Sequence, residues 1–252
     1  MVISRKSPRE IECMREAGAV VAEALALCER LARPGVTTEE LDRNVESLIV
    51  KKKGVPLFKG YRGYPASICA SINEEVVHGI PGPRPLKNGD ILSVDVGVRV
   101  GSYCGDAART IAVGDISKEA KRLISVCETS LTRAIETIRA DMRLSTISRA
   151  VQLYVESQGC SVVRKYTGHG IGREMHEDPQ VPNFVAAGAP DPVLPSGVVL
   201  AIEPMVNAGN ENVEVLEDGW TVVTKDRSLS AHFEHTVAIT ENGPDVLTVL
   251  SA

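Results

Sequence analysis

The pattern of hydrophobic and polar residues predicts two helices at the start of the chain. Apolar residues recur at helical spacing over Ser7–Leu31, where Ser7, Pro8 and Glu10 supply a capping residue, a first-turn proline and the acid of a capping box. A second helix with the same type of box is predicted from Thr37 to about Lys53. A Pro-Gly pair separates the two helices, because neither residue favours continuation of a helix.

Strand-like runs bounded by Gly and Pro follow this helical pair, and the whole order then repeats. The first strand-like runs cover Ala66–Ile80 and Asp90–Val113. The second helical pair is predicted from Ser117 to about Ala140 and from Ser145 to about Gln158, and strand-like runs then continue to Val249. Two helices followed by strands, twice over, predict an α+β fold.

Two landmarks suggest that the second half repeats the first. The pattern G-x-x-L-x-[VI]-acid occurs at Gly89–Asp95 and again at Gly197–Glu203, 108 residues further on. The predicted helix starts at Thr37 and Ser145 are separated by the same 108 residues. We therefore expect one domain, residues 1–252, built from two related halves at about 7–113 and 117–249.

The composition narrows the function. The chain has 252 residues, and 28 basic against 33 acidic residues give a net charge of −5, which argues against a protein that mainly grips phosphate backbones. The amino-terminal segment is too charged for a signal peptide, and the apolar stretch after it is too short to span a membrane. None of the six cysteines forms a C-x-x-C pair. We expect free thiols in a cytoplasmic protein.

Two pairs of acids are placed to meet across hairpins. A turn centred on Val100–Gly101 would put Asp95 directly opposite Asp106, with their Cβ atoms ~4.5–5.5 Å apart. A turn centred on Asp218–Gly219 would do the same for Glu203 and Glu234, and Asp-Gly is a strong hairpin signal. Opposed carboxylates repel unless a cation lies between them.

A single acidic residue on a strand usually points into solvent and has no further role. Two pairs of opposed acids in matching repeats are difficult to explain as solvent-exposed residues. Brought together by the pseudo-symmetry, the four carboxylates would form a nest for divalent cations. The residues Gly168, Gly170 and Gly172 surround His169, let the backbone approach closely and expose the imidazole as a metal ligand.

The other histidines divide into two groups. For His78 and His176 the pattern leaves a role in the site and a structural role equally open. His232 and His235 flank Glu234 on a predicted strand. We expect both to point to the face opposite Glu234, and therefore exclude them as ligands.

Several stretches give the chain a clear family resemblance. They are GYRGYPASICASINEEVVHGIPG, SVDVGVRVGSYCGDAART, YTGHGIGREMHEDPQV, LAIEPMVN and DRSLSAHFEHTVAIT. Over about Ser7–Val249 the chain resembles type I methionine aminopeptidases of the bacterial type, without an amino-terminal extension. The resemblance implies the pita-bread fold, with two pseudo-symmetric halves around a curved antiparallel sheet. Only 34 residues separate His169 from Glu203, which leaves no room for the helical insert of type II enzymes.

The resemblance also implies a reaction: removal of the initiator methionine from nascent polypeptides when the second residue is small. Two divalent ions (Co, Mn, Fe, Zn or Ni) would be held by Asp95, Asp106, His169, Glu203 and Glu234. A hydroxide bridging them would attack the first peptide bond, with Glu203 as the proton shuttle. His176 would contact the carbonyl oxygen, and His78 the scissile nitrogen side.

A substrate pocket and weaker sites follow from the same resemblance. Three of the nine aromatic residues fall within seven positions, Phe58, Tyr61 and Tyr64, as expected of a ligand wall. The implied methionine pocket comprises Phe58, Tyr61, Tyr64, Cys69, Met175 and Trp220. Phe58 and Met175 replace the family's frequent Cys and Phe, and both remain apolar. A Na⁺ or K⁺ is a weaker expectation near Asn73, Val76 and Ser230.

Two other functions of the same fold stay open. One is an X-prolyl aminopeptidase or prolidase, which the Tyr61, Tyr64 and Trp220 pocket disfavours. The other is a non-catalytic binding protein, whose relatives lose metal ligands that this chain keeps. We expect a monomer that acts on nascent chains, does not bind nucleic acid sequence-specifically and does not enter membranes. Lys51–Lys53 is a candidate contact for the ribosome, although such a run is more often a solvated helix end.

Overall fold

The computed structural model describes residues 2–250, and its four long helices are those that the sequence predicts. The Ser7 and Thr37 side chains cap the first two helices, each within a complete capping box. The third helix ends before the predicted Ala140, because the chain leaves helical geometry after Thr137 and Asp141 adopts φ 62°. The helices are α1 Pro8–Leu31, α2 Thr38–Lys51, α3 Lys118–Glu136 and α4 Ser145–Ser157.

The strands of the first half lie mainly in one antiparallel sheet, in which β4 lies between β5 and β2 and also pairs with β1. Its long strands are the predicted run from Asp90 to Val113. The strands are β1 Gly54–Pro56, β2 Cys69–Ile72, β3 Glu75–Val77, β4 Ile91–Val100 and β5 Tyr103–Ala112, with a short 3₁₀ helix at Tyr61–Gly63.

The second half contributes a five-stranded sheet in the order β17-β16-β11-β8-β9, together with smaller sheets. The small sheet β13-β14-β3 takes a strand from each half. The strands are β6 Met142–Arg143, β7 Ser161–Val162, β8 Gly168–Gly170, β9 Glu177–Val181, β10 Val193–Leu194, β11 Val199–Ile202, β12 Met205–Asn207, β13 Val213–Val215, β14 Val222–Thr224, β15 Ser230–His232, β16 His235–Thr240 and β17 Gly243–Val246.

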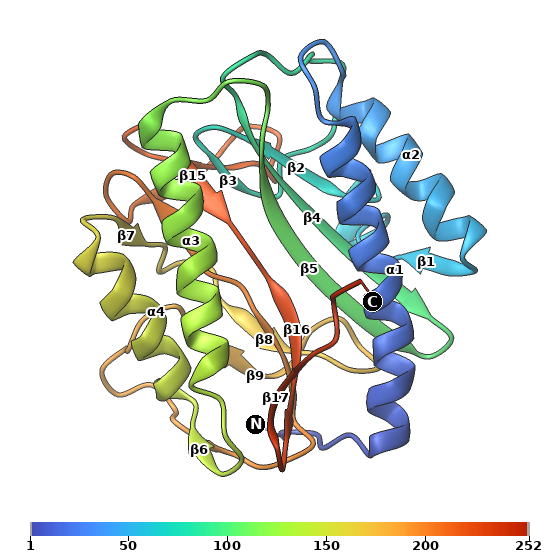
Figure 1. Ribbon diagram of the computed structural model, residues 1–252, viewed down its shortest axis with the longest axis vertical. Helices are drawn as coiled ribbons and strands as arrows, with labels where there is room; N and C mark the ends of the chain where they lie inside the picture. The colour runs from blue at the N-terminus through green and yellow to red at the C-terminus, as the bar shows by residue number, and fades with distance from the viewer. Residues whose placement is uncertain (1, 251–252) are drawn as a thin grey trace.

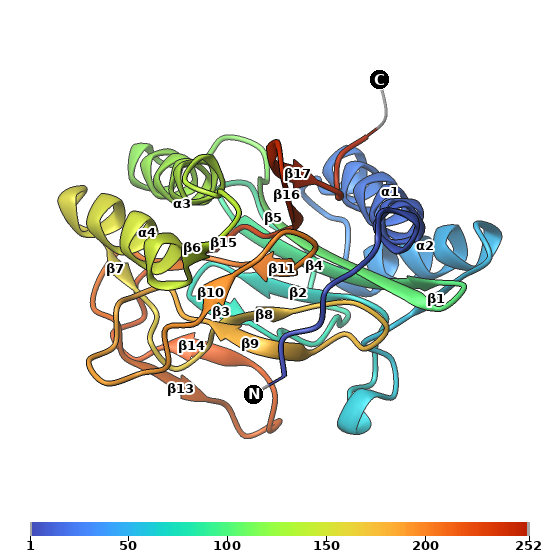
Figure 2. The same ribbon diagram turned by 90° about the horizontal axis from the view of Figure 1, so that it is seen from below.

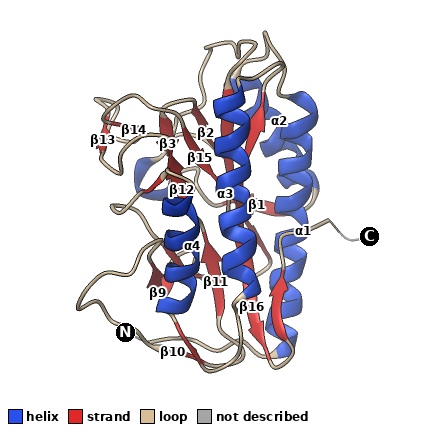
Figure 3. Cartoon of the chain, turned by 60° about the vertical axis from the view of Figure 1, so that its left-hand side comes forward, coloured by secondary structure: helices blue, strands red, loops and turns tan. Residues whose placement is uncertain are grey.

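The four helices form a layer on one face of the strands (Figures 1 and 2). Each half has its own buried core, one beneath α1 and α2 and one beneath α3 and α4. Within this layer α1 packs beside α2 and α3 packs beside α4, and Figure 3 shows the helices in front of the strands. The repeated order of two helices and then strands agrees with the sequence pattern, while the division of one domain into duplicated halves stays a prediction.

The two halves join at the centre, where β5 meets the start of β16. The Glu234 N–H donates to the Ala108 carbonyl at 2.9 Å, and the Ala108 N–H donates back to Glu234. The Thr236 hydroxyl donates to the Asp106 carbonyl at 2.8 Å and accepts from the Asp106 N–H at 3.0 Å. These bonds fix one acid from each half beside the other.

The register predicted for the first hairpin is wrong by two residues. Asp95 pairs with Ala108 and Asp106 pairs with Gly97, so the turn lies at Gly101–Ser102 and not at Val100–Gly101. The two acids are therefore diagonal neighbours. They remain on one face, because the side-chain period of a strand is two residues.

The register predicted for the second hairpin is confirmed. Ile202 pairs with His235, and Val215 pairs with Val222 on either side of the Asp218–Gly219 turn. Gly219 takes φ 77° there, which suits glycine. The same arrangement places Glu203 opposite Glu234, immediately beyond the paired ends of β11 and β16.

Candidate metal centre and substrate pocket

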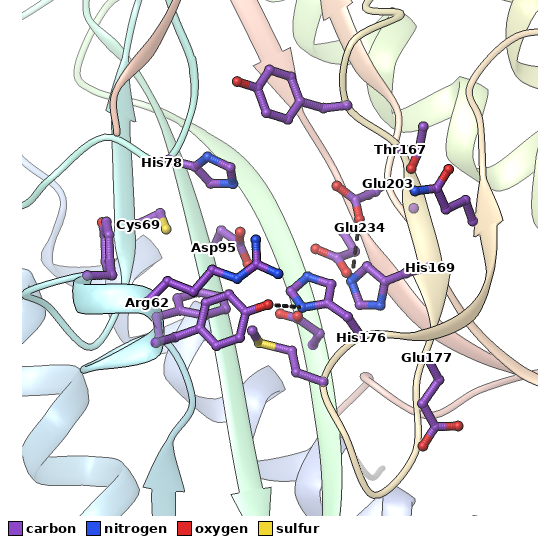
Figure 4. Close-up of a pocket in the computed structure, with 18 of the residues that line it drawn as sticks. Arg62, Cys69, His78, Asp95, Thr167, His169, His176, Glu177, Glu203 and Glu234 are labelled. Atoms are coloured by element: carbon purple, nitrogen blue, oxygen red, sulfur yellow. Dashed lines mark hydrogen bonds and ion pairs between the residues drawn. The ribbon is translucent and has the colours of Figure 1, made fainter. Parts of the chain in front are cut away.

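A cavity of about 750 Å³ opens between the two halves. Every residue that the sequence assigns to metal or substrate lines it, except the three of the monovalent cation site (Figure 4). These lining residues are Phe58, Tyr61, Tyr64, Cys69, His78, Asp95, Asp106, His169, Met175, His176, Glu203, Trp220 and Glu234.

The five proposed ligands come from β4, β5, β8, the end of β11 and the start of β16. Ligand atoms of Asp106, His169 and Glu234 all lie within 4.8 Å of one another. The Glu203 Oε1 atom is 3.6 Å from the His169 Nε2 atom. Asp95 lies on the same face of the sheet as Asp106, which pairs with Gly97 two residues further along β4.

Burial and mutual repulsion hold protons on these carboxyl groups. Burial raises the pKa values of Asp95, Glu203 and Glu234 well above the ordinary range, and the negative charge of Asp106 raises them further. Burial raises the pKa of Asp106 to about 7. Such a group of acids carries its full charge near neutral pH only if cations neutralise it.

The residues fit divalent metal ions. Within residues 2–250, Asp95 Oδ1, Asp106 Oδ1 and Glu234 Oε1 are buried oxygens without a hydrogen-bond partner. Buried acceptors of this kind are costly unless something binds them. Carboxylate oxygens with one imidazole suit first-row divalent ions.

The local structure directs His169 into the nest. Its Nδ1 atom lies 2.9 Å from the Gly170 carbonyl, so Nδ1 carries the proton and Nε2 offers its lone pair to the cavity. The flanking glycines allow the close packing that the sequence suggests. A Cβ at Gly168 would lie 2.4 Å from the Ala201 carbonyl of β11, and one at Gly170 would lie 2.2 Å from the Asp178 carbonyl.

The structure brings His176 and His78 into the cavity from opposite sides (Figure 4). The His176 ring lies 4.3 Å from that of His169 at an interplanar angle of 58°, and its Nδ1 atom lies 3.1 Å from the Tyr61 hydroxyl. His78 has φ 61°, a strained conformation for a non-glycine residue that often marks functional sites. Burial and the neighbouring His176 lower the pKa of His78 to about 4, so its ring is neutral.

The predicted apolar wall forms one cluster. Phe58, Tyr64, Cys69 and Met175 are buried together, and Tyr61 and Trp220 pack against them. The Trp220 ring meets the Tyr64 ring edge to face at 5.1 Å. Tyr64 is fixed because its hydroxyl donates to the Gly79 carbonyl at 2.9 Å. An unbranched apolar side chain would be enclosed here beside the carboxylates.

The residues of the predicted monovalent cation site lie elsewhere. The Asn73 carbonyl accepts the Ser230 N–H at 2.9 Å, which brings Asn73, Val76 and Ser230 to one region outside the cavity. A cation there stays a prediction.

Sequence reasoning overlooked several residues of the site. Arg62, Lys165, Tyr166, Thr167, Gly168, Glu177, Asp178 and Gln180 also line the cavity. The orientation predicted for His232 is wrong, because its Nε2 atom lies 3.9 Å from Glu203 Oε2. Residues two apart on a strand share a face, so the two-residue spacing of His232 and Glu234 could have predicted that both point toward the site.

Comparisons with known proteins agree with this geometry. Residues 12–241 match the model of metallopeptidase family M24. A methionine aminopeptidase of Clostridium perfringens is 53% identical over 99% of this chain and 100% of that protein. The Escherichia coli K12 methionine aminopeptidase is 45% identical over 99% of this chain and 95% of that protein.

The fold has close structural counterparts. A crystal structure of methionine aminopeptidase from Thermotoga maritima has a TM-score of 0.96 and 47% identity, and the alignment covers 98% of this chain and 100% of that one. A Pyrococcus furiosus prolidase, with a TM-score of 0.79 and 22% identity over 98% of this chain and 66% of that one, shares the fold alone.

The chain therefore belongs to metallopeptidase family M24 and is a metal-dependent hydrolase with the pita-bread fold. Divalent metal ions are its cofactors. No helix within residues 2–250 is long and apolar enough to cross a membrane. The six cysteines are free thiols, as expected.

Proposed function

We propose that the protein removes the amino-terminal methionine from polypeptides whose second residue is small. The main observation behind this proposal is that the acidic metal nest and an apolar cluster line the same cavity. Phe58, Tyr64 and Met175 belong to that cluster, and an unbranched thioether would make favourable contacts with its rings. The names of the similar proteins support the same activity.

The five proposed ligands would hold two divalent ions. Asp95 would hold one ion, His169 and Glu203 would hold the other, and Asp106 and Glu234 would contribute to both. When bound, the ions supply Lewis-acid polarisation of the scissile carbonyl and lower the pKa of coordinated water to ~7. Co, Mn, Fe, Zn and Ni all suit this donor set.

The protein's own groups bind the peptide and move its protons. Glu203 receives the proton of the attacking water and passes it to the leaving amine, since its carboxyl group is buried beside the nest. We assign the donor role in the 3.1 Å contact to the Tyr61 hydroxyl and the acceptor role to His176 Nδ1, which leaves a His176 Nε2–H to donate to the developing oxyanion. His78 lies on the side of the scissile nitrogen.

The pocket also sets which end of a peptide is accepted. The free α-amine of the substrate would lie near Asp95, and the methionine side chain would fill the space beside Tyr61, Cys69 and Trp220. The first residue of a chain would occupy this pocket with its free amine at the nest. An X-prolyl aminopeptidase or prolidase of the same fold has no comparable support.

The deciding experiment is hydrolysis of a Met-X-Ser panel with metal-replete and metal-free protein. We expect release of methionine from Met-Ala-Ser with metal, slow cleavage when X is bulky, and none without metal. The Glu203→Gln variant should retain the fold and lose turnover. Faster cleavage of X-Pro peptides than of Met-Ala-Ser would reject the proposal in favour of a prolidase.

The cellular location, the oligomeric state and the ribosome contact are also proposals. We expect a cytoplasmic monomer that meets nascent chains near the ribosome. Of the three candidate contact residues Lys51–Lys53, Lys52 pairs with Glu23 at 2.6 Å on the exposed surface. Cosedimentation with ribosomes at low and high salt tests this contact, because phosphate contacts weaken steeply with salt.

A further inference from the structure

One buried histidine next to the metal nest has no role in the function proposed so far. His232 ends β15, two residues before Glu234, and only 2% of its surface is exposed. Within residues 2–250 its Nε2 atom is buried and has no hydrogen-bond partner. An orphaned imidazole nitrogen in the interior is costly unless it acts on something nearby.

The group in front of this nitrogen is the Glu203 carboxylate. The His232 Nε2 atom lies 3.9 Å from Glu203 Oε2, and the His169 Nε2 atom lies 3.6 Å from Glu203 Oε1. The carboxylate therefore lies between two imidazoles, one facing each oxygen. The hydrogen bond of His169 Nδ1 to the Gly170 carbonyl leaves the His169 Nε2 lone pair for a metal ion.

The backbone of His232 is held firmly enough to fix its ring. Its N–H donates to the Thr110 hydroxyl at 2.9 Å, and that hydroxyl donates to the His232 carbonyl at 2.9 Å. Its strand partner is Met205 on β12.

The geometry does not favour His232 as a metal ligand. It is absent from the lining of the cavity, whereas Glu203 lines it. Among the described residues, the atoms that gather within 4.8 Å of one another belong to Asp106, His169 and Glu234. His232 therefore lies behind Glu203 as seen from the nest.

We propose that His232 is a positioning residue for Glu203: its Nε2–H donates to Glu203 Oε2 and holds the carboxylate in the orientation that binds metal and receives the proton. The donation needs a shift of about 1 Å from the 3.9 Å separation, which the flexible Glu203 side chain supplies when it takes up its ligand position. The role in proton transfer rests on the proposed function, while the role in metal binding does not.

The test compares metal affinity with turnover. Manganese is titrated calorimetrically into metal-free wild type, His232→Leu and His232→Gln, and kcat and KM are then measured on Met-Ala-Ser. We expect the His232→Leu substitution to raise the Kd for Mn²⁺ by about 10- to 100-fold and to lower kcat with little change in KM. Gln, which keeps an N–H donor, should restore most of the affinity.

His235→Leu is the matched control. His235 is a half-buried histidine next to Glu234, but its Nδ1 atom bonds to the Thr248 hydroxyl at 2.8 Å on the other face of the strand. We expect wild-type Mn²⁺ affinity from this control. A folded His232→Leu protein with wild-type Mn²⁺ affinity would overturn the role in metal binding, whether or not the wild type cleaves Met-Ala-Ser. If the wild type does cleave it, a wild-type kcat in this variant would overturn the role in proton transfer.

A second measurement needs no variant. Nitrogen-15 NMR of histidines in the zinc-loaded wild type reports the tautomer and ligation of each ring. We expect His232 to show a protonated, hydrogen-bonded Nε2. A bare or metal-bound Nε2 would contradict the donation, and this result stands even if the His232 variants fail to fold.

Discussion

Removing the charge of Lys6 is expected to destabilise the protein and to misplace His176. Lys6 is buried, and its Nζ atom lies 2.7 Å from Glu177 Oε2, the residue directly after His176. The other Glu177 oxygen accepts the Arg173 N–H at 2.9 Å. This ion pair therefore fastens the amino-terminal segment to the loop that presents His176 to the cavity.

The magnitude follows from what Glu177 keeps in a Lys6→Met variant. Removing one partner of a buried pair costs ~3–5 kcal/mol. The Glu177 side chain is 19% exposed and retains the Ser4 hydroxyl donor at 2.6 Å, so we expect a smaller loss, about 2–3 kcal/mol. For a chain of this size that loss lowers Tm by roughly 5–10 °C.

Activity should fall as well, because a small displacement of a positioned group is costly in catalysis. We expect kcat on Met-Ala-Ser to drop about tenfold in Lys6→Met, measured with saturating metal below the melting temperature. Lys52→Met is the control, since its pair with Glu23 is as short, at 2.6 Å, but exposed. If the two variants share the same Tm and kcat, the Lys6–Glu177 pair does not hold the loop.

Three further predictions concern metal, packing and pH. Asp106→Asn should lose at least one bound metal equivalent by elemental analysis. Its metal-free stability should fall less between about pH 4 and 7 than that of the wild type, because in this range the folded wild type holds a proton on Asp106 that the unfolded chain releases. Gly105→Ala should cost ~1–3 kcal/mol in urea unfolding, since its Cβ would lie 2.8 Å from the Gly18 nitrogen of α1; wild-type stability would show that α1 can shift freely. Burial and Arg109 lower the pKa of His235 to about 4, so the free energy of unfolding of the wild type should fall by about 2 kcal/mol as pH falls from about 7.5 to 5. The His235→Gln variant should lose less stability over this range, and an equal loss would refute this reasoning.

Local signals in the sequence were sufficient for the helices and for one hairpin. The capping boxes at Ser7 and Thr37 need only neighbouring residues, and they appear as predicted. The Asp218–Gly219 turn fixes its own register, which carries Glu203 opposite Glu234. The first hairpin has a single turn glycine, so its register could slip by two without exposing any apolar face.

Some features of the candidate site can be predicted from neighbouring residues, and others depend on contacts between distant segments. Alternation along strands showed which acids share a face, and the glycines around His169 marked a crowded strand. The union of Asp106 with Glu234, by contrast, depends on bonds between β5 and β16, more than 120 residues apart. Such pairing carries no signal in either segment alone.

The sequence by itself determined the element order, the face of each acid and the resemblance to an M24 peptidase, because those features depend on neighbouring residues and on motif spacing. Only the tertiary structure decided that His232 turns toward Glu203, that Lys6 fastens the loop of His176, and that burial keeps protons on the acids of the nest. Burial and long-range contact arise when distant segments exclude water together, and no local pattern encodes them.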